Sequence, residues 1–357
     1  MHWVHYHHLR LLRVVGGGDD LLYLLQHEGK QEVKILFVAK HNSGDNDDEG
    51  AVTYALRQLG HEVTTVHELR RHRSMEDEAM LRQSSSFDLC LFFKWDDVEA
   101  IKAARCPKVF WYFDMVRSVE DDPTLKARSD YRVEWMKRVV PECLVGFCTD
   151  GDWVRHVNSC AVVAKTHEQR IQLKHGALVH LMQGADERYV GLGTPIPDYK
   201  GGDILFTGMI NHGQKRASHV AKLRDRYGDR FTVLGDGGPR HRLHGRSLAD
   251  LFASVKVVVA PDGPNTDSYW SNRVYLTTGL GGLLLHPFCK GLTKHYSVSE
   301  LAYYASHEHL EQIIDEVCSM SDADRLRVRT VGLDAARTRN LYRHRCEDLI
   351  KEVEKRL

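Results

Sequence analysis

The stretch 33–66, VKILFVAKHNSGDNDDEGAVTYALRQLGHEVTTV, decides the fold class of this chain. Its first residues, VKILFVA, form a nearly continuous apolar run, which is typical of a parallel strand buried on both faces. A polar loop leads into a helix, AVTYALRQL, which ends at Gly60, and HEVTTV then has the pattern of a second strand. Strand, helix and strand in this order form a βαβ unit, which predicts an α/β domain with a parallel sheet.

The rest of the chain repeats this pattern in two series, separated by a glycine- and proline-containing stretch near 175–202. The first series continues through DLCLFF, KVFWYF and CLVGFCT, and the second contains DILFTG, FTVLG, KVVVAP and GLLLHP. We predict two doubly wound, Rossmann-like α/β domains facing a cleft, with ligands at the carboxyl ends of the strands. The predicted segments are an N-terminal extension at 1–32, a first domain at 33–185, a second domain at 186–340, and a terminal helix at 341–357 that packs back on the first domain.

The amino-acid composition argues against several classes of protein. The 357 residues are 42% apolar and carry 49 basic and 49 acidic side chains, so the formal charge is zero. This balance argues against a protein that coats a polyanion, although it does not exclude a basic face. The eight cysteines include no CxxC pair, which favours reduced thiols in a cytoplasmic protein. No apolar run reaches the roughly 18 residues of a membrane span, and the histidine-rich start has no signal-peptide pattern.

The second half resembles a known family. The segments that carry the resemblance, in order, are LVHLMQGADERY, DILFTGMINHGQKR, FTVLGDGGP, LHGRSLADLFASVKVVVAP and SNRVYLTTGLGGLLL. Across about 175–350 they are similar to the C-terminal domain of GT-B glycosyltransferases, and most of all to the CgeB-type branch of the family-4-like enzymes. The resemblance implies transfer of a sugar from a nucleotide-diphosphate sugar, with a UDP-sugar as the default donor, to a hydroxyl acceptor, without a metal or other cofactor. The first half matches this fold only in general terms.

The stretch YWSNRVYLTTGLGGLLLHP, at 269–287, is the strongest candidate for binding the leaving diphosphate. Ser271 or Asn272 is expected to cap a helix that begins near Arg273 and to leave N–H groups aimed at the ligand. Arg273 adds a forked donor for phosphate, and Gly281 and Gly282 would let the backbone approach closely. The alternative interpretation is an ordinary helix cap beside a surface arginine.

Further donor-site residues follow from the resemblance. In the family, the loop after the first strand of the second domain and the next helix contact the diphosphate, which implies roles for Gly208, Lys215 and Arg216. The backbone near Gly235 and Arg246 is expected to meet the base. Solvated basic residues and ordinary turn glycines are the alternatives for these positions.

Acceptor chemistry is expected in the first domain. Asp114 and His41 each follow a predicted strand, so both should lie at its carboxyl edge, where either can act as a general base. The alternative role of Asp114 is to cap the segment that follows it. Asp262 holds a similar edge position in the second domain without a clear role. The acidic loop at 45–49 is expected to be a solvated loop.

Two alternatives remain open. The resembled family usually has a glutamate, commonly bonded to the ribose, where this chain has Leu276, so a degenerate GT-B protein that binds a nucleotide or saccharide without turnover is the second functional hypothesis. The related proteins also occur among phage genes, where hydroxymethylated DNA bases are glycosylated. The basic clusters at 70–73 and 240–244 are suited to a DNA backbone, so DNA is an alternative acceptor.

Overall fold

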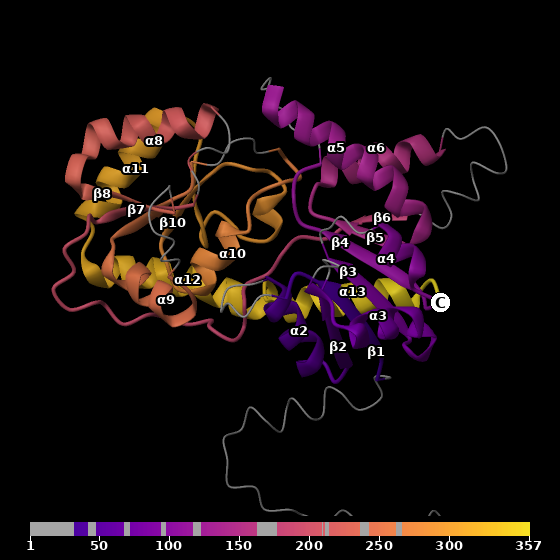
Figure 1. Cartoon of the computed structure of the whole chain (residues 1–357). Coiled ribbons are helices and arrows are strands. Elements are labelled where there is room, and N and C mark those ends of the chain that lie inside the picture. The colour runs from indigo at the N-terminus through magenta and orange to yellow at the C-terminus, as the bar shows by residue number, and fades with distance from the viewer. Residues whose placement is uncertain are drawn as a thin grey trace, which may run out of the picture. The chain divides into compact units, whose positions relative to one another are not determined.

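Two parallel sheets organise the chain (Figure 1). The computed structural model describes residues 32–41, 48–67, 72–93, 98–116, 123–162, 177–208, 210, 214–235, 243–261 and 266–357. Within them, residues 33–357 belong to one compact unit. Both sheets are flanked by helices, so the predicted α/β class with two Rossmann-like domains is confirmed, whereas the predicted extension at 1–32 falls almost wholly outside the described residues.

The first sheet has six parallel strands among the described residues, in the order β2-β1-β3-β4-β5-β6. The strands are β1 Lys34–Ala39, β2 Glu62–His67, β3 Leu89–Phe93, β4 Lys108–Tyr112, β5 Val145–Cys148 and β6 Ala177–His180. The helices in this part of the chain are α2 Asp48–Gln58, α3 Met75–Arg82, α4 Val98–Ala103, α5 Pro123–Val139 and α6 Gly151–Val162. Alternate residues of β1 enter different cores: Phe37 packs with α2, and Leu36 packs on the opposite face. Burial on both faces explains the continuous apolar run of β1.

The second sheet has the order β11-β10-β9-β7-β8 over the described part of the chain. Its strands are β7 Ile204–Thr207, β8 Phe231–Leu234, β9 Val257–Val259, β10 Leu284–Pro287 and β11 Ala302–Tyr304. The helices that follow β6 are α8 Gln214–Tyr227, α9 Gly245–Ser254, α10 Arg273–Gly279, α11 His307–Ser319, α12 Asp322–Arg339 and α13 Tyr342–Glu354. Leu205 of β7 packs with α9 and α10, and its neighbour Phe206 packs with α8 and α11, so this sheet is also covered on both faces.

The chain passes between the two domains twice, and the two connections are hydrogen-bonded to each other. On the outgoing connection, Ala185 N donates to Asn340 O at 2.7 Å, and Ala185 O accepts from Tyr342 N at 3.0 Å. Gly184 permits this approach, because a Cβ there would lie 2.4 Å from Tyr342 N. After this contact α13 runs beside α2 (Figure 1), and its apolar face, including Leu349, joins the core of the first sheet.

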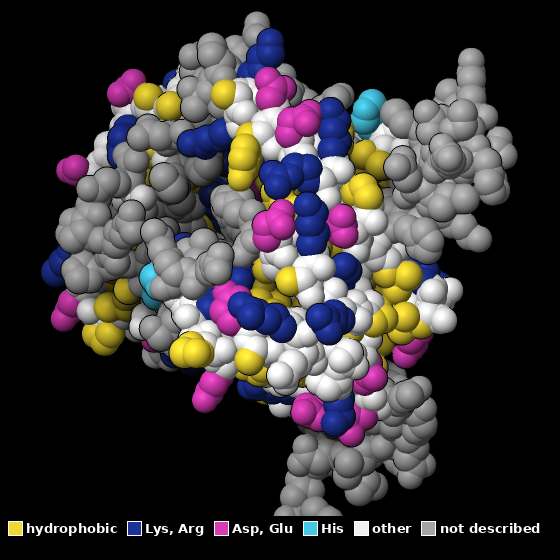
Figure 2. Space-filling model, turned by 45° about the vertical axis from the view of Figure 1, so that its right-hand side comes forward, with side chains coloured by type: hydrophobic (Ala, Val, Ile, Leu, Met, Phe, Trp, Pro, Cys, Tyr) yellow, Lys and Arg dark blue, Asp and Glu magenta, His cyan; other side chains and the backbone are white. Residues whose placement is uncertain are grey.

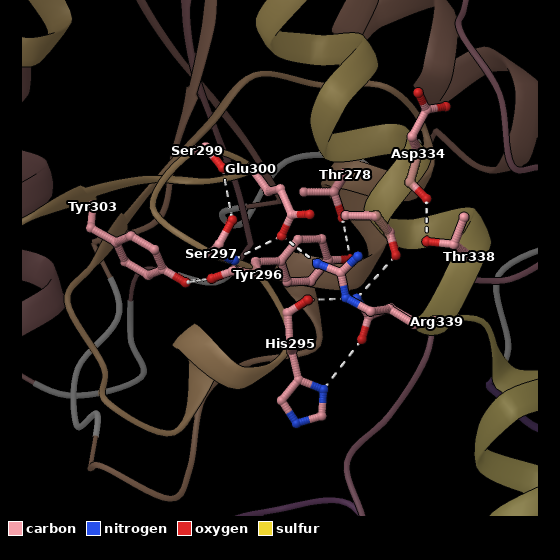
Figure 3. Close-up of polar contacts among 12 residues, drawn as sticks. Thr278, His295, Tyr296, Ser297, Ser299, Glu300, Tyr303, Asp334, Thr338 and Arg339 are labelled. Atoms are coloured by element: carbon pink, nitrogen blue, oxygen red, sulfur yellow. Dashed lines mark hydrogen bonds and ion pairs between the residues drawn. The ribbon is translucent and has the colours of Figure 1, made fainter.

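A polar network ties the end of α12 to the loop before β11 (Figure 3). Glu300 forms an ion pair with Arg339 and also accepts from Ser297 N at 2.8 Å. In the same loop, the Tyr296 hydroxyl lies 2.7 Å from Thr278 Oγ1, which links the loop to the end of α10. Helices α10 and α12 and this loop therefore form one hydrogen-bonded body.

Arg345 of α13 is buried at the point where the two connections meet. Its Nε donates to Gln183 O at 3.0 Å, its Nη1 to Arg339 O at 3.2 Å, and its Nη2 to Asn340 Oδ1 at 2.7 Å. The guanidinium also lies 5.5 Å from the centroid of the Tyr275 ring. One side chain thus donates to acceptors on the outgoing connection and on the returning connection, which is the turn between α12 and α13.

We predict that Arg345→Met lowers the free energy of unfolding by at least about 2 kcal/mol, because buried carbonyl acceptors lose their donors. Urea unfolding measures this change. The matched control is Arg327→Ala on α12, whose side chain is 77% exposed and pairs with Asp324 at the surface. That variant should stay within about 0.5 kcal/mol of the wild type. Equal stability of the two variants would contradict the role given to Arg345.

His295 makes the stability of this junction depend on pH. Its Nδ1 lies 3.1 Å from Arg345 Nη2, and burial followed by the nearby Arg345 cation lowers the His295 pKa to about 4. Between the ordinary pKa of about 6.5 and this value, only the unfolded chain gains the proton, so folding weakens as the pH falls.

We predict that the stability advantage of the wild type over His295→Gln shrinks by up to roughly 3 kcal/mol between pH 7 and pH 4. Denaturant unfolding at several pH values measures it. His156→Gln, at an exposed position of α6, is the control and should stay within about 0.5 kcal/mol of the wild type at pH 7. A pH-independent effect of His295→Gln would show that the imidazole does not stay neutral in the fold.

Candidate functional site

The carboxyl edge of the second sheet brings two glycine turns together. Gly208 follows β7 with φ of 137°, and Gly235 follows β8 with φ of 108°, a region that side chains other than glycine rarely adopt. Gly208 N donates to Leu234 O at 2.8 Å, and a Cβ on Gly235 would lie 3.2 Å from Gly208 O. Both predicted turn glycines are therefore at the same edge and in contact.

Arg273 lies against this pair of turns. Its Nε donates to Thr207 O at 2.8 Å, and its guanidinium carbon is 5.0 Å from the centroid of the Phe206 ring. A Cβ on Gly208 would lie 2.6 Å from Arg273 Nη2, so only glycine leaves room for the guanidinium. The residue is 8% exposed. The alternative prediction, a surface arginine, is therefore wrong. Arg273 is a buried cation at the carboxyl end of β7.

The start of α10 differs from the prediction. Ser271 Oγ accepts from Arg273 N at 3.2 Å, whereas Asn272 has helical backbone angles and its side chain forms no capping bond. Val274 N donates to Ser271 O and Leu276 N to Asn272 O. The expected set of N–H groups aimed at a ligand is thus largely used within the turn, and α10 has seven residues, too few for its dipole to matter much. Binding of an anion here has to rest on Arg273.

Gly281 and Gly282 lie at the opposite edge of the sheet. They follow the end of α10 and precede β10, whose first residue, Leu284, pairs with Val258 near the start of β9. A Cβ on Gly281 would meet Leu192, and one on Gly282 would meet Thr277. The prediction that these glycines approach the diphosphate is wrong, because a helix that starts at the carboxyl edge ends at the amino edge.

The other predicted donor residues sit at helix starts near this edge. Arg216, in the first turn of α8, is 8% exposed, whereas its neighbour Lys215 is exposed. Arg246, in the first turn of α9, is largely exposed, with Nε 3.6 Å from Asp250 Oδ1. Arg246 Nη1 also lies 3.9 Å from the Cβ position of Gly191, on the outgoing connection. Their contacts with a nucleotide stay a prediction.

The two predicted acceptor-side residues both lie at the carboxyl edge of the first sheet. Asp114, after β4, is half exposed and lies 3.5 Å from Arg132 Nη2. His41, after β1, has Nε2 3.1 Å from Phe37 O, and burial lowers its pKa. A lowered pKa keeps the imidazole neutral near pH 7, and donation from Nε2 to the carbonyl leaves Nδ1 as the acceptor nitrogen. His41 therefore has the protonation state that a general base needs.

A contact between the two domains was missed in the sequence. Asp150 follows β5 and caps α6, with its Oδ1 accepting from Trp153 N at 3.0 Å. Next to it, Gly151 N donates to Ser268 O at 3.0 Å, and Arg155 Nη1 donates to Ser268 Oγ at 2.7 Å. The TDGD run after a strand is a helix-start signal that could have located the cap, but not its partner in the other domain.

Several predicted residues fall outside the described part of the chain: Asp45, Asp47, Arg70, Arg71, Asp236, Arg240, His241, Arg242 and Asp262. Of the residues that the structure describes, no three His, Cys, Asp or Glu side chains gather in a way that could hold a metal ion. No helix in the same set is long and apolar enough to cross a membrane.

Comparison with known proteins agrees with this architecture. A family model described as glycosyl transferase-like matches residues 215–351, and no curated protein matches the sequence. The N-terminal domain of Candida albicans trehalose-6-phosphate phosphatase gives a TM-score of 0.58 at 10% identity, with 92% of this chain and 98% of that chain covered. The UDP-forming α,α-trehalose-phosphate synthase of Burkholderia vietnamiensis gives 0.53 at 10%, with 90% and 100% covered. A mutant of T4 phage BGT in complex with UDP-glucose gives 0.52 at 13%, with 89% and 99% covered.

The chain has the GT-B fold. The family match covers the second domain from α8 to α13, which includes Arg273 and Arg345. The predicted GT-B resemblance is thus confirmed. Assignment to the CgeB-type branch stays a prediction.

We predict that Gly208→Ala lowers the free energy of unfolding by about 1–3 kcal/mol, through a positive φ and a clash with Arg273. Thermal or urea unfolding measures the change. Gly60→Ala is the matched control, since φ there is 87° but nothing lies within 4 Å of the added Cβ. In an Arg273→Ala background the cost of Gly208→Ala should fall toward that of the control. The same cost in both backgrounds would contradict the steric contact.

Proposed function

We propose that the protein transfers a sugar from a nucleoside-diphosphate sugar, by default a UDP-sugar, to a hydroxyl group of an acceptor. The observation that carries the proposal is the buried Arg273, held over the glycine turn of Gly208 at the carboxyl end of β7. Ligands of doubly wound domains bind at this edge. Two similarly folded proteins support the choice of UDP: the trehalose-phosphate synthase is UDP-forming, and the T4 phage protein is in complex with UDP-glucose.

The chemistry needs stabilisation of a leaving diphosphate. Arg273 supplies a guanidinium whose Nε is fixed on Thr207 O and whose plane rests near the Phe206 ring, so little side-chain freedom remains to be lost on binding. A forked cation in a largely dry site is well suited to charge that grows on phosphate oxygens. Lys215 and Arg216 at the start of α8 are the proposed additional cations, and this set needs no metal ion for the leaving group.

The acceptor hydroxyl must lose a proton during transfer. His41, whose lowered pKa keeps it neutral, and Asp114, which is half exposed beside Arg132, are the proposed bases at the edge of the first sheet. Leu276 contributes no hydrogen bond to a ribose; it is a partly buried residue packed against the core that includes Tyr275. Recognition of the ribose is therefore assigned to other groups of the second domain.

A donor screen tests the proposed function. The purified protein is mixed with UDP-, GDP-, ADP- and dTDP-sugars, and thermal shift and release of nucleoside diphosphate are followed together. A shift and release with one nucleotide is the expected result. A thermal shift without release of nucleoside diphosphate, whichever acceptor is added, would instead favour a binding protein without turnover, as Leu276 suggests. The absence of a thermal shift with every nucleotide sugar would overturn the proposal.

We predict that Arg273→Ala weakens UDP binding at least tenfold, or about 1.4 kcal/mol, because a forked phosphate donor is lost. Isothermal calorimetry measures the affinity. Arg224→Ala, an exposed arginine in the last turn of α8, is the control and should bind UDP like the wild type. Unchanged UDP affinity in folded Arg273→Ala would remove the diphosphate from this site.

A further inference from the structure

Basic side chains gather at the carboxyl edge of β1 and β2. The register pairs Ala39, the last residue of β1, with His67, the last residue of β2. Lys40 and His41 follow Ala39 directly, so they leave the sheet beside His67. Lys40 is exposed, and both histidines are partly buried.

The segment before α3 adds two more basic groups to this edge. The His72 ring centroid lies 5.0 Å from that of His67. Arg73 Nε donates to His67 O at 2.7 Å, and its Nη1 lies 3.4 Å from Glu78 Oε1. The Arg73 side chain is almost completely buried, so the end of β2 is fixed to this segment. Lys40, His41, His67, His72 and Arg73 are called the basic edge below.

Among the described residues, cations outnumber carboxylates around the imidazoles of the basic edge. The cations that act on its imidazoles are Lys40, Arg57 and Arg73, and the carboxylates close by are Asp77 and Glu78. Burial lowers the pKa of His67, and His72, Arg73 and Lys40 lower it further. Burial also lowers the pKa of His41, with smaller contributions from His67 and Arg57. Burial is thus the main reason why His41 and His67 disfavour a proton, and the neighbouring cations add to it. An anion arriving here gains the attraction of the fixed cations and allows the histidines to take up protons.

We propose that the basic edge binds the phosphate group of a small phosphorylated acceptor. The inference rests on the proposed function, which assigns the acceptor to the first domain. A phosphate carries nearly two negative charges and three acceptor oxygens, which suits the exposed Lys40 amine and the nearby imidazoles, with the buried Arg73 cation behind them. Asp114, the other proposed base, lies at the carboxyl edge of the same sheet, so a phosphate held at the basic edge would place the acceptor on the side of the sheet that carries this carboxylate.

A small acceptor is favoured over a nucleic acid. DNA binding needs several phosphates contacted along an extended strip of cations. The formal charge of this chain is zero, and Figure 2 shows Lys and Arg side chains mixed with Asp and Glu over the face in view. The described residues of the basic edge lie at the ends of two neighbouring strands and in the segment before α3.

The first test measures phosphate binding without turnover. The imidazole signals of His41 and His67 are titrated by NMR, with inorganic phosphate, a hexose 6-phosphate and the free hexose as probes. The expected result is a rise of about one unit in both pKa values with either phosphate, since one unit corresponds to 1.36 kcal/mol of added interaction with the charged form. The free hexose should leave them unchanged. No rise at about 10 mM phosphate, a typical weak-site concentration, would overturn the proposal.

Variants locate the site. Lys40→Ala combined with His72→Gln changes two exposed residues and should weaken hexose 6-phosphate binding about tenfold, by loss of two charge-assisted contacts. Lys34→Ala, at the other end of β1, is the matched control, since Lys34 is an exposed lysine paired with Glu62. If Lys34→Ala weakened hexose 6-phosphate binding equally, the effect would come from overall charge, and the assignment of the phosphate site to the basic edge would be overturned. Shifts produced by a DNA duplex but not by the hexose phosphate would overturn it in favour of nucleic acid.

A final comparison separates this inference from the proposed function. The Lys40→Ala, His72→Gln variant should keep the UDP affinity of the wild type and lose UDP release that depends on the hexose phosphate. UDP release that is unaffected by phosphorylated acceptors would overturn the acceptor assignment alone. Loss of UDP binding in the wild type, with the phosphate shifts intact, would overturn the proposed function and with it the acceptor role of the basic edge.

Discussion

The structure depends on burying one cation where the chain crosses between its domains. A guanidinium removed from water is costly unless its donors are satisfied, and Arg345 meets that condition with backbone carbonyls and an amide oxygen rather than with a carboxylate. Its fork fixes Gln183 of the outgoing connection to Arg339 and Asn340 of the returning one. The parallel contact between Ala185 and Leu341 extends the same junction. The two sheets are thus joined by a hydrogen-bonded pair of connections, not by a free linker.

Arg273 repeats the same principle for a different purpose. It too is a buried arginine whose Nε is held by a carbonyl, but it stands at the end of a parallel strand, where the fold concentrates ligand chemistry. Gly208 gives the Arg273 guanidinium room because it has no Cβ, and for the same reason few other residues can replace it. In the proposed function, the residues that keep this guanidinium in place also orient it for phosphate, so part of the ordering cost of binding is met during folding.

The sequence predicted the fold well because buried parallel strands leave a strong pattern. Continuous apolar runs such as that of β1 indicated both sheets. Gly208 and Gly235 were predicted to lie at the carboxyl edge because each follows a predicted strand. The prediction for Gly281 and Gly282 failed because spacing along the chain does not show which edge of a sheet a turn occupies. Arg345 was missed because an arginine in an amphipathic, charged helix looks solvated until its tertiary partners are known. The pairing of Ser268 with Gly151 was equally hidden, since it joins positions more than a hundred residues apart.

Helix α13 gives the first domain a discontinuous core. Tyr342, Leu349 and Val353 pack among strand residues such as Phe37 and Trp111, although the whole second domain lies between them in the chain. During synthesis an N-terminal domain ordinarily folds before the next one is made. Here the first domain is left with an uncovered apolar face until α13 has been made and the second domain has brought it back. The first domain is therefore completed last. Until then its core surface is exposed in the nascent chain, and protection of that surface depends on chaperones.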